Sequence, residues 1–273
     1  MAETADAPPL PDGVTLVRAP NPGPMTLDGT NSWVLRGPGA RASVVIDPGP
    51  TDAAHLARLA EGGVELVLIT HRHPDHTEAV DAFAELTGAP VRAVDPTWCR
   101  GAAPLADGER IAAGGVVLDV LATPGHTSDS ACFALAGREG TEGTDGAAAA
   151  TAPVAVFTGD TVLGRGTTII AHPDGALGPY LGALERLRAL GAARPITVLP
   201  GHGPVLPDLA AICDAYLAHR AERLGQIRDA LGRLGADATA EAVTDDVYAD
   251  VDPSVRGAAE ASVRAQLEYL RGA

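Results

Sequence analysis

Short apolar runs separated by turn-forming residues dominate the first three quarters of the chain. Residues 14–18, 31–36 and 43–47 are three such runs, and Gly and Pro lie in the turns between them. Runs of this length, bounded by Gly and Pro, are typical of β-strands joined by tight turns. They therefore predict a meander of three strands. Further strands are expected at residues 64–69, 91–94, 116–121, 131–135, 154–157 and 196–199.

Apolar residues at helical spacing lie between several of these strands and dominate the last quarter of the chain. There, Leu217, Leu224 and Leu231 recur at seven-residue intervals, which predicts a long helix that packs along one side. We therefore expect residues 1–205 to form one domain and residues 206–273 a small helical domain. Helices are expected at residues 51–60, 77–86, 180–190, 207–234, 239–248 and 253–270.

Composition and charge narrow the possible functions. The chain has 273 residues, 46% of them hydrophobic, which suffices for one large domain with a small appendage. Its formal net charge of -15 opposes unspecific binding to nucleic acid or to anionic membranes, because both attract basic surfaces. Residues 137–151 are rich in Gly, Ala, Thr and acidic residues without apolar periodicity, which predicts an inserted mobile hairpin loop and not a functional element.

The N-terminal residues and the cysteines indicate a location inside the cell. Residues 1–13 are acidic and rich in Pro and lack the basic start and apolar centre of a signal peptide. No apolar run approaches the ~20 residues of a membrane span. Cys99, Cys132 and Cys213 lie far apart and form no C-x-x-C pair, so neither a disulfide framework nor a thiolate zinc site is expected. We expect a cytoplasmic protein with buried thiols and no membrane partner.

Three imidazoles and a carboxylate follow the apolar run that ends at Ile69. His71 and His73 fall on the same side of an extended segment, so both rings can reach one ion. Asp75 and His76 fall where the backbone must turn, and two neighbouring ions can share the cluster. Imidazole nitrogen combined with carboxylate oxygen suits zinc first, with iron and manganese as the next candidates. The alternative is a solvated polar loop that happens to contain three His.

Three later residues repeat this placement. His126, Asp160 and His202 each follow an apolar strand and small turn residues. A single His or Asp at a strand end is more often a structural hydrogen bonder than a ligand. Strand ends along one sheet edge converge in space, however, so four such ends in series favour a shared metal site at that edge.

The order of these residues resembles that of a known family. The signature His-x-His-x-Asp-His at residues 71–76, followed by the later His, Asp and His, resembles the metallo-beta-lactamase superfamily over about residues 14–205. The resemblance implies an α/β fold, the four-layer αββα sandwich, with two zinc ions at one sheet edge. By position, it implies that His71, His73 and His126 hold the first metal, that Asp75, His76 and His202 hold the second, and that Asp160 bridges both.

Two acidic residues take further roles in this interpretation. Asp75 sits where a carboxylate both binds metal and orients the hydroxide, which makes it the candidate catalytic residue. Asp47 follows an apolar strand and resembles the family's acid that steadies the ligand loop from behind. A turn carboxylate ahead of Pro48 is the other interpretation of Asp47.

Further stretches narrow the resemblance to one branch. Residues 21–31, 157–168 and 216–220 are similar to the beta-lactamase-like protein 2 branch, which implies a small winged-helix-like C-terminal domain. The chain departs from the family where Thr77-Glu78-Ala79 replaces the frequent Gly-Gly, and it leaves no residues for a β-wing after its last helix. Residues 206–273 contain twelve Asp and Glu against seven Arg, which puts nucleic-acid binding by this tail in doubt.

The candidate substrate contacts lie in the same stretches. Thr30, Asn31, Arg165 and Thr167 are expected to line the site, with Arg165 as an anion clamp. Their alternative roles are turn formers and, for Arg165, a surface cation.

Together these residues predict a dinuclear zinc hydrolase in which a metal-bridging hydroxide attacks a carbonyl or phosphoryl centre. A small ester or thioester is the favoured substrate because it suits the acidic charge and the short tail. A single-strand-specific RNA endonuclease is the alternative enzyme, since the resembled branch also contains that activity. A metal-containing binding protein without turnover is the alternative of another class, and a mononuclear iron oxygenase would use the same ligands.

Overall fold

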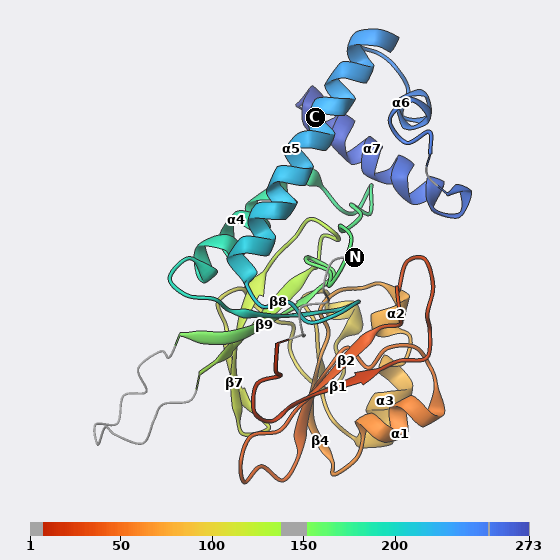
Figure 1. The fold of residues 1–273 in the computed structure, drawn as a ribbon. Coiled ribbons are helices and arrows are strands. Elements are labelled where there is room, and N and C mark those ends of the chain that lie inside the picture. The colour runs from red at the N-terminus through yellow and green to blue at the C-terminus, as the bar shows by residue number, and fades with distance from the viewer. Residues whose placement is uncertain (1–7, 138–151, 251, 273) are drawn as a thin grey trace, which may run out of the picture.

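Two five-stranded β-sheets form the body of the molecule (Figure 1). The computed structural model describes residues 8–137, 152–250 and 252–272. The first sheet contains, in spatial order, β1 (Val14–Arg18), β2 (Asn31–Leu35), β3 (Ser43–Ile46), β4 (Val64–Leu68) and β5 (Val91–Arg92). Neighbours among β1, β2 and β3 are antiparallel, as the predicted meander requires, and β4 and β5 continue the sheet in parallel.

The second sheet is assembled from later strands. It contains, in chain order, β6 (Arg110–Ala113), β7 (Val116–Ala122), β8 (Ala131–Ala136), β9 (Pro153–Gly159) and β10 (Thr197–Pro200). Its spatial order is β10-β9-β8-β7-β6, with β10 parallel to β9 and the other pairs antiparallel. The edge strand β6 was not predicted, because Ile111 is its only large apolar residue and its only buried one.

Seven helices lie within the described residues. They are α1 (Ala53–Leu59), α2 (Pro74–Thr77), α3 (Val80–Thr87), α4 (Leu177–Gly191), α5 (Leu209–Leu234), α6 (Ala240–Val247) and α7 (Arg256–Arg271), with short 3-10 turns at Pro96–Trp98 and Pro253–Val255. The helix predicted at residues 77–86 is therefore two helices. Asp75 lies in the first turn of α2 and does not precede the helix as expected, because Pro74 at the first helical position already starts it after His73.

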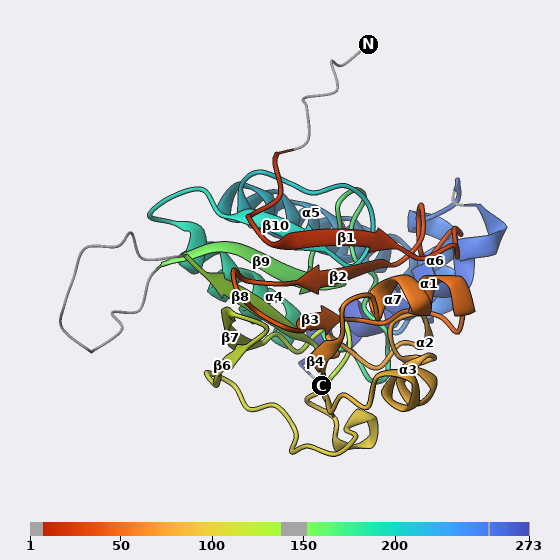
Figure 2. The same ribbon diagram turned by 90° about the horizontal axis from the view of Figure 1, so that it is seen from below.

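Apolar side chains inside and outside the two sheets produce four layers (Figure 2). Trp33 of β2 and Phe157 of β9 meet between the sheets, with ring centroids 5.7 Å apart in an edge-to-face arrangement. Leu59 of α1 and Phe83 of α3 belong to the cluster that covers the outer face of the first sheet. Leu184 of α4 belongs to the cluster outside the second sheet. The order helix, sheet, sheet, helix is the predicted αββα sandwich.

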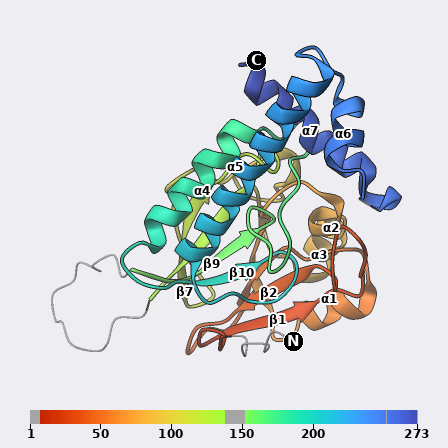
Figure 3. The same ribbon diagram turned by 45° about the horizontal axis from the view of Figure 1, so that its top comes forward.

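The C-terminal helices continue from the outer layer of the second sheet into another apolar cluster. The first part of α5 lies along α4 (Figure 3), where Leu209, Cys213 and Tyr216 join the cluster on that sheet. Farther along α5, Ile227 packs with Val263 of α7 in a cluster of its own. The described residues after β10 form helices and contain no strand, so no β-wing is present among them.

Three further observations concern single residues and segments. Trp33 is buried in the core, whereas Trp98 is only half-buried, against the cluster beneath α3. Apart from Gly137, the predicted loop at residues 137–151 lies outside the described residues. Within the described part of the chain, none of the helices combines the length and apolar character needed to cross a bilayer.

The cysteines should differ in reactivity because the thiolate is the nucleophilic form of the side chain. Burial raises the pKa of Cys132 to about 11 and that of Cys213 to about 12, so both stay protonated at mildly alkaline pH. We expect iodoacetamide to modify the half-buried Cys99 first in the native protein, as measured by mass spectrometry. Unfolding in guanidinium should expose all three thiols, and rapid modification of Cys132 in the native state would contradict the prediction.

Candidate metal centre

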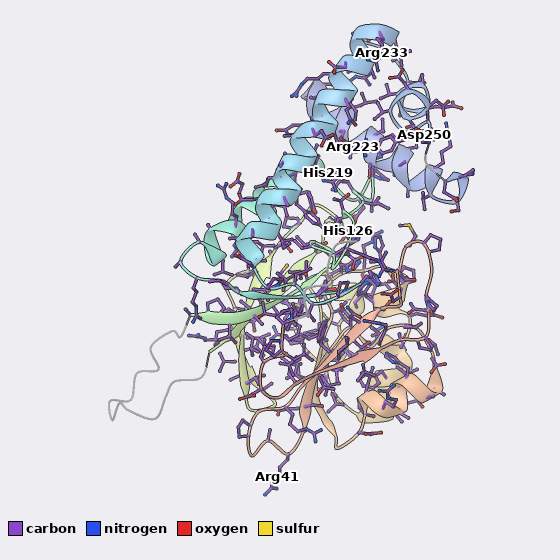
Figure 4. All side chains as sticks on the ribbon, in the orientation of Figure 1. Arg41, His126, His219, Arg223, Arg233 and Asp250 are labelled. Atoms are coloured by element: carbon purple, nitrogen blue, oxygen red, sulfur yellow. The ribbon has the colours of Figure 1, made fainter. Side chains whose placement is uncertain are left out.

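All the predicted metal ligands lie in one linked cluster at one end of the sandwich. Residues 71–76 follow β4 of the first sheet, whereas His126, Asp160 and His202 follow β7, β9 and β10 of the second. The ligands therefore come from the ends of two facing sheets, and the expectation of a single sheet edge was wrong. Figure 4 shows His126 at this end of the sandwich, below the C-terminal helices.

Three imidazoles form the first group. Nδ1 of His73 lies 3.1 Å from Nε2 of His71 and 3.0 Å from Nε2 of His126. A tetrahedral zinc site with bonds of about 2.0 to 2.1 Å places its ligand nitrogens roughly 3.3 Å apart. The three nitrogens are therefore spaced as ligands of one ion would be.

A carboxylate and two imidazoles form the second group. Oδ2 of Asp75 lies 3.0 Å from Nε2 of His202 and 3.3 Å from Nε2 of His76. The two Nε2 atoms of His76 and His202 are 3.3 Å apart. This group has the same spacing as the first, with one oxygen donor in place of a nitrogen.

Asp160 lies between the two groups. Its Oδ1 is 3.4 Å from Nε2 of His202, and its Oδ2 is 3.8 Å from Nε2 of His126. Oδ1 is buried and has no hydrogen-bond partner among the described residues, although an anionic oxygen is costly to bury without one. Gly201 allows the close approach, since a Cβ there would lie 2.5 Å from the same oxygen. A cation would satisfy this oxygen, so the residues present fit a metal ion.

Burial keeps the first group of imidazoles neutral. It holds the pKa of His71 well below its ordinary value, lowers the pKa of His73 to about 4 and also lowers the pKa of His126. Neighbouring imidazoles lower the first two values further, because a charge on one ring disfavours a charge on the next. Neutral imidazole is the form that binds a metal ion.

Nearby carboxylates raise the pKa values of the two imidazoles in the second group. Burial alone would lower the pKa of His202, but the carboxylate of Asp160 raises it to about 9. The pKa of His76 is raised well above its ordinary value against the effect of burial, because Asp75 and Asp47 lie beside it. A cation that binds here must therefore displace protons from His76 and His202.

Asp47 holds His76 from behind. Its Oδ2 accepts hydrogen bonds from Nδ1 of His76 at 2.8 Å and from Oγ1 of Thr70 at 2.6 Å, and its Oδ1 accepts from the Thr70 backbone N–H at 2.8 Å. These contacts aim Nε2 of His76 at the site and support the first interpretation of Asp47. No role for Thr70 is predicted from the sequence, although its position directly before the histidine cluster is a usable signal.

Two sets of hydrogen bonds fix the loops that carry the histidines. His126 donates from Nδ1 to the carbonyl oxygen of Ile169 at 2.6 Å, which leaves Nε2 for the site. Arg72 donates to Asp174 at 2.9 Å, and the same carboxylate accepts from Oγ of Ser128 at 2.6 Å. This ion pair has no signal in the sequence, because Arg72 and Asp174 lie 102 positions apart.

Two of the predicted substrate residues are buried beside the metal ligands. Thr30 donates from Oγ1 to Oδ2 of Asp75 at 3.2 Å. Asn31 donates from Nδ2 to the carbonyl oxygens of Pro200 at 3.0 Å and Gly203 at 2.9 Å. Both amide protons of Asn31 therefore hold the loop that contains His202, and a substrate contact by Asn31 stays a prediction.

The other two predicted substrate residues lie farther out and already have protein partners. Arg165 donates through both terminal nitrogens to the carboxylate of Asp28, each at 2.8 Å. An anionic substrate would have to compete with that carboxylate. Oγ1 of Thr167 lies 3.3 Å from Nε2 of His219 on α5.

Comparison with known proteins identifies the family. The family model described as Metallo-beta-lactamase superfamily matches residues 25–141. The chain is 32% identical over 275 residues to the Beta-lactamase-like protein 2 homolog of Caenorhabditis elegans, which covers 96% of this chain and 85% of that protein. The chain therefore belongs to the metallo-beta-lactamase superfamily, and the predicted resemblance to the beta-lactamase-like protein 2 branch is confirmed.

Other similar proteins support an enzymatic class and the fold. A protein of Aspergillus chevalieri named Atrochrysone carboxyl ACP thioesterase is 34% identical over 240 residues, which is 82% of this chain and 69% of that protein. The chain spans only 66% and 64% of two fungal lactamase-like relatives. A metallo-beta-lactamase family protein from Thermus thermophilus has the same fold, with a TM-score of 0.74 and 24% identity over 95% of this chain and 93% of that chain. The protein is a metal-dependent hydrolase of this family.

Replacing Asp47 by Asn should weaken metal binding. The amide keeps the size of the side chain but turns one acceptor into a donor that faces Thr70 or His76. We expect the metal dissociation constant, measured by competition with a chelator, to rise about 10- to 100-fold. Asp52→Asn, at the N-cap of α1, is the matched control and should leave it unchanged. Equal affinity of Asp47→Asn and the wild type would contradict the role of Asp47.

Zinc affinity should increase with pH. The pKa of His202 is about 9 before metal binds, so the ring carries a proton at neutral pH that an incoming ion must displace. Raising the pH toward about 9 removes this cost, whereas lowering it toward about 6 leaves the His202 ring fully protonated. Dissociation constants measured with a chromophoric chelator across this range should therefore fall as pH rises. A constant affinity over the range would show that His202 is not a ligand.

Proposed function

We propose that the protein is a dinuclear zinc hydrolase that cleaves the thioester or ester bond of a small acyl substrate. The observation that carries the proposal is the pair of ligand groups on either side of Asp160, whose buried Oδ1 lacks a donor among the described residues. Nitrogen and carboxylate donors suit zinc, and iron and manganese also bind such sets. His71, His73 and His126 would hold one ion and Asp75, His76 and His202 the other, with Asp160 shared between them.

When bound, the two ions would supply a water molecule of lowered pKa and would polarise the scissile carbonyl. Asp75 is the more exposed carboxylate of the site, at 25% compared with 11% for Asp160, so it lies on the side that a substrate can reach. Thr30 fixes its orientation by donating to Oδ2. The Asp75 carboxylate is thus placed to orient the attacking water.

The lack of a proton donor for the leaving group favours a thioester over an oxygen ester as the substrate. The pKa values of Asp75 and Asp160 are lowered against the effect of burial, chiefly by His76 in the first case and by His202 in the second. Both carboxylates would also be bound to metal in the loaded enzyme, so neither would be a proton donor at neutral pH. A thiol has a pKa of about 8.5, so a thiolate can leave without a donor, whereas an alkoxide is much more basic. The thioesterase name of the Aspergillus chevalieri relative supports the same substrate class.

Removing a central ligand should abolish both metal content and turnover. We expect His71→Ala and Asp160→Ala to bind less zinc than the wild type, which should contain two ions per chain by elemental analysis. Acyl-thioester hydrolysis should fall roughly a thousandfold or more, because metal activation supplies several kcal/mol. Asp245→Ala, on the exposed side of α6, is the matched control. Full activity of a variant that binds no metal would end the proposal.

A substrate panel separates the alternatives. Purified protein would be assayed with an acyl thioester, the matching oxygen ester and a single-stranded RNA. We expect the order thioester, ester, RNA, because the net charge of -15 opposes approach of a polyanion. Preferred RNA cleavage with a steep salt dependence would favour the endonuclease instead. Two bound zinc ions without turnover on the panel would favour a binding protein.

A further inference from the structure

One irregular segment contacts three of the candidate metal ligands. Residues 163–172, the bridging loop, run between α5 and the strand ends (Figure 1). On the inner side, Thr168 donates from Oγ1 to the backbone carbonyl of Asp160 at 2.7 Å, and the Gly164 N–H donates to the carbonyl of His202 at 2.8 Å. The loop also accepts the Nδ1–H of His126 at Ile169, as described above. The loop therefore holds one residue from each of three strand ends.

The C-terminal helices hold the outer side of the same loop. The N–H of Leu163 donates to the hydroxyl of Tyr216 at 3.0 Å, and the N–H of Ile170 donates to the hydroxyl of Ser262 at 3.2 Å. The first partner lies on α5 and the second on α7. His219, which contacts Thr167, lies on the part of α5 that faces this end of the sandwich (Figure 4). The C-terminal helices thus contact the bridging loop over most of the length of the loop.

Arg220 of α5 is the least expected of these contacts. It is only 3% exposed, its guanidinium lies 5.1 Å from the ring centre of Tyr180, and no carboxylate of the described residues forms an ion pair with it. It donates from Nη2 to the carbonyl of Thr168. Arg is charged at any ordinary pH, and burying its charge without an ion pair is costly. An apolar side chain would fill this space without that cost, so packing alone does not account for a guanidinium here.

The contacts of Arg220 lead to Asp160 by two routes. Thr168, which accepts its hydrogen bond, donates to the Asp160 carbonyl. Tyr180, against which it stacks, donates from its hydroxyl to the carbonyl of Thr161 at 2.8 Å. Both peptide units on the C-terminal side of Asp160 are therefore held by groups that Arg220 contacts. Arg220 therefore affects the site through the positions of these backbone groups.

We propose that Arg220 is a positioning residue through which the C-terminal helices fix the bridging loop, and with it the side chains of Asp160 and His126. The inference rests on the proposed metal site for its functional meaning, but the positions of the two side chains can be tested without metal.

The first test uses metal-free protein. Arg220→Met keeps an unbranched side chain and removes every donor, and Arg220→Lys keeps the positive charge and an ammonium group that can donate. In the wild type, ¹⁵N NMR of labelled histidine should show His126 as a single tautomer protonated at Nδ1, because that atom donates to Ile169. We expect this signal to shift or split in Arg220→Met and to recover in Arg220→Lys. Arg223→Met, one turn along α5, is the control and should leave the signal unchanged.

The second test measures cobalt binding and metal-free stability together. We expect Arg220→Met to raise the Co²⁺ dissociation constant about 10-fold or more and to change the visible absorption of the bound ion. Thr168→Val removes the hydroxyl that holds Asp160 and should have a similar effect. The double variant should be little worse than either single one, since both act on the same contact path.

Three results have distinct meanings. If Arg220→Met lowers only the unfolding temperature, with His126 signals and Co²⁺ affinity unchanged, the positioning role is wrong and Arg220 is merely structural. Fully additive effects of Arg220→Met and Thr168→Val would also overturn it. If the wild type binds no Co²⁺ while Arg220→Met still disturbs His126, the positioning role stands and the proposed metal function fails.

Discussion

The packing of two sheets against a single apolar interior is the constraint on which the site depends. The candidate ligands follow strands of both sheets, so their mutual distances are set by how the sheets face each other. Facing sheets lie about 10 Å apart. Large side chains such as Trp33 and Phe157 fill that space and fix the separation. Donor atoms only 3.0 to 3.5 Å apart across the two sheets tolerate little sliding between them.

Burial of so many polar side chains at one end of the sandwich has a cost that neighbouring groups offset. His71, His76 and His202 are almost fully buried, and imidazoles this close repel one another when charged. Asp47 and Thr70 hold His76 in place, and the bridging loop holds His126. Oδ1 of Asp160 has no hydrogen-bond donor among the described residues, and the nearby imidazoles of His76 and His202 offset part of the cost of burying its charge. Function and stability therefore make opposite demands here, as is common at active sites.

The sequence was sufficient to predict which residues gather at the site, because that information is local. The spacing of His71 and His73 and the placement of later residues after apolar strands depend on short stretches of chain. Contacts between distant segments carry no such signal, and the brace from Arg72 to Asp174 and the contact of Arg220 with Thr168 were missed for this reason. A substrate contact by Arg165 stays a prediction, and no sequence pattern indicated that its guanidinium would pair with Asp28. Zinc, the substrate and the boundary at residue 205 stay predictions.

The long helix α5 links the tail to the main body in a way that affects how the molecule comes apart. Leu224 packs in the apolar cluster on the second sheet, whereas Ile227, less than one helical turn later, packs in the tail cluster. Loss of the tail by unfolding or proteolytic cleavage would thus expose apolar side chains on the outer face of the second sheet. Because α5 contributes side chains to both apolar clusters, we expect the main body and the C-terminal helices to unfold together.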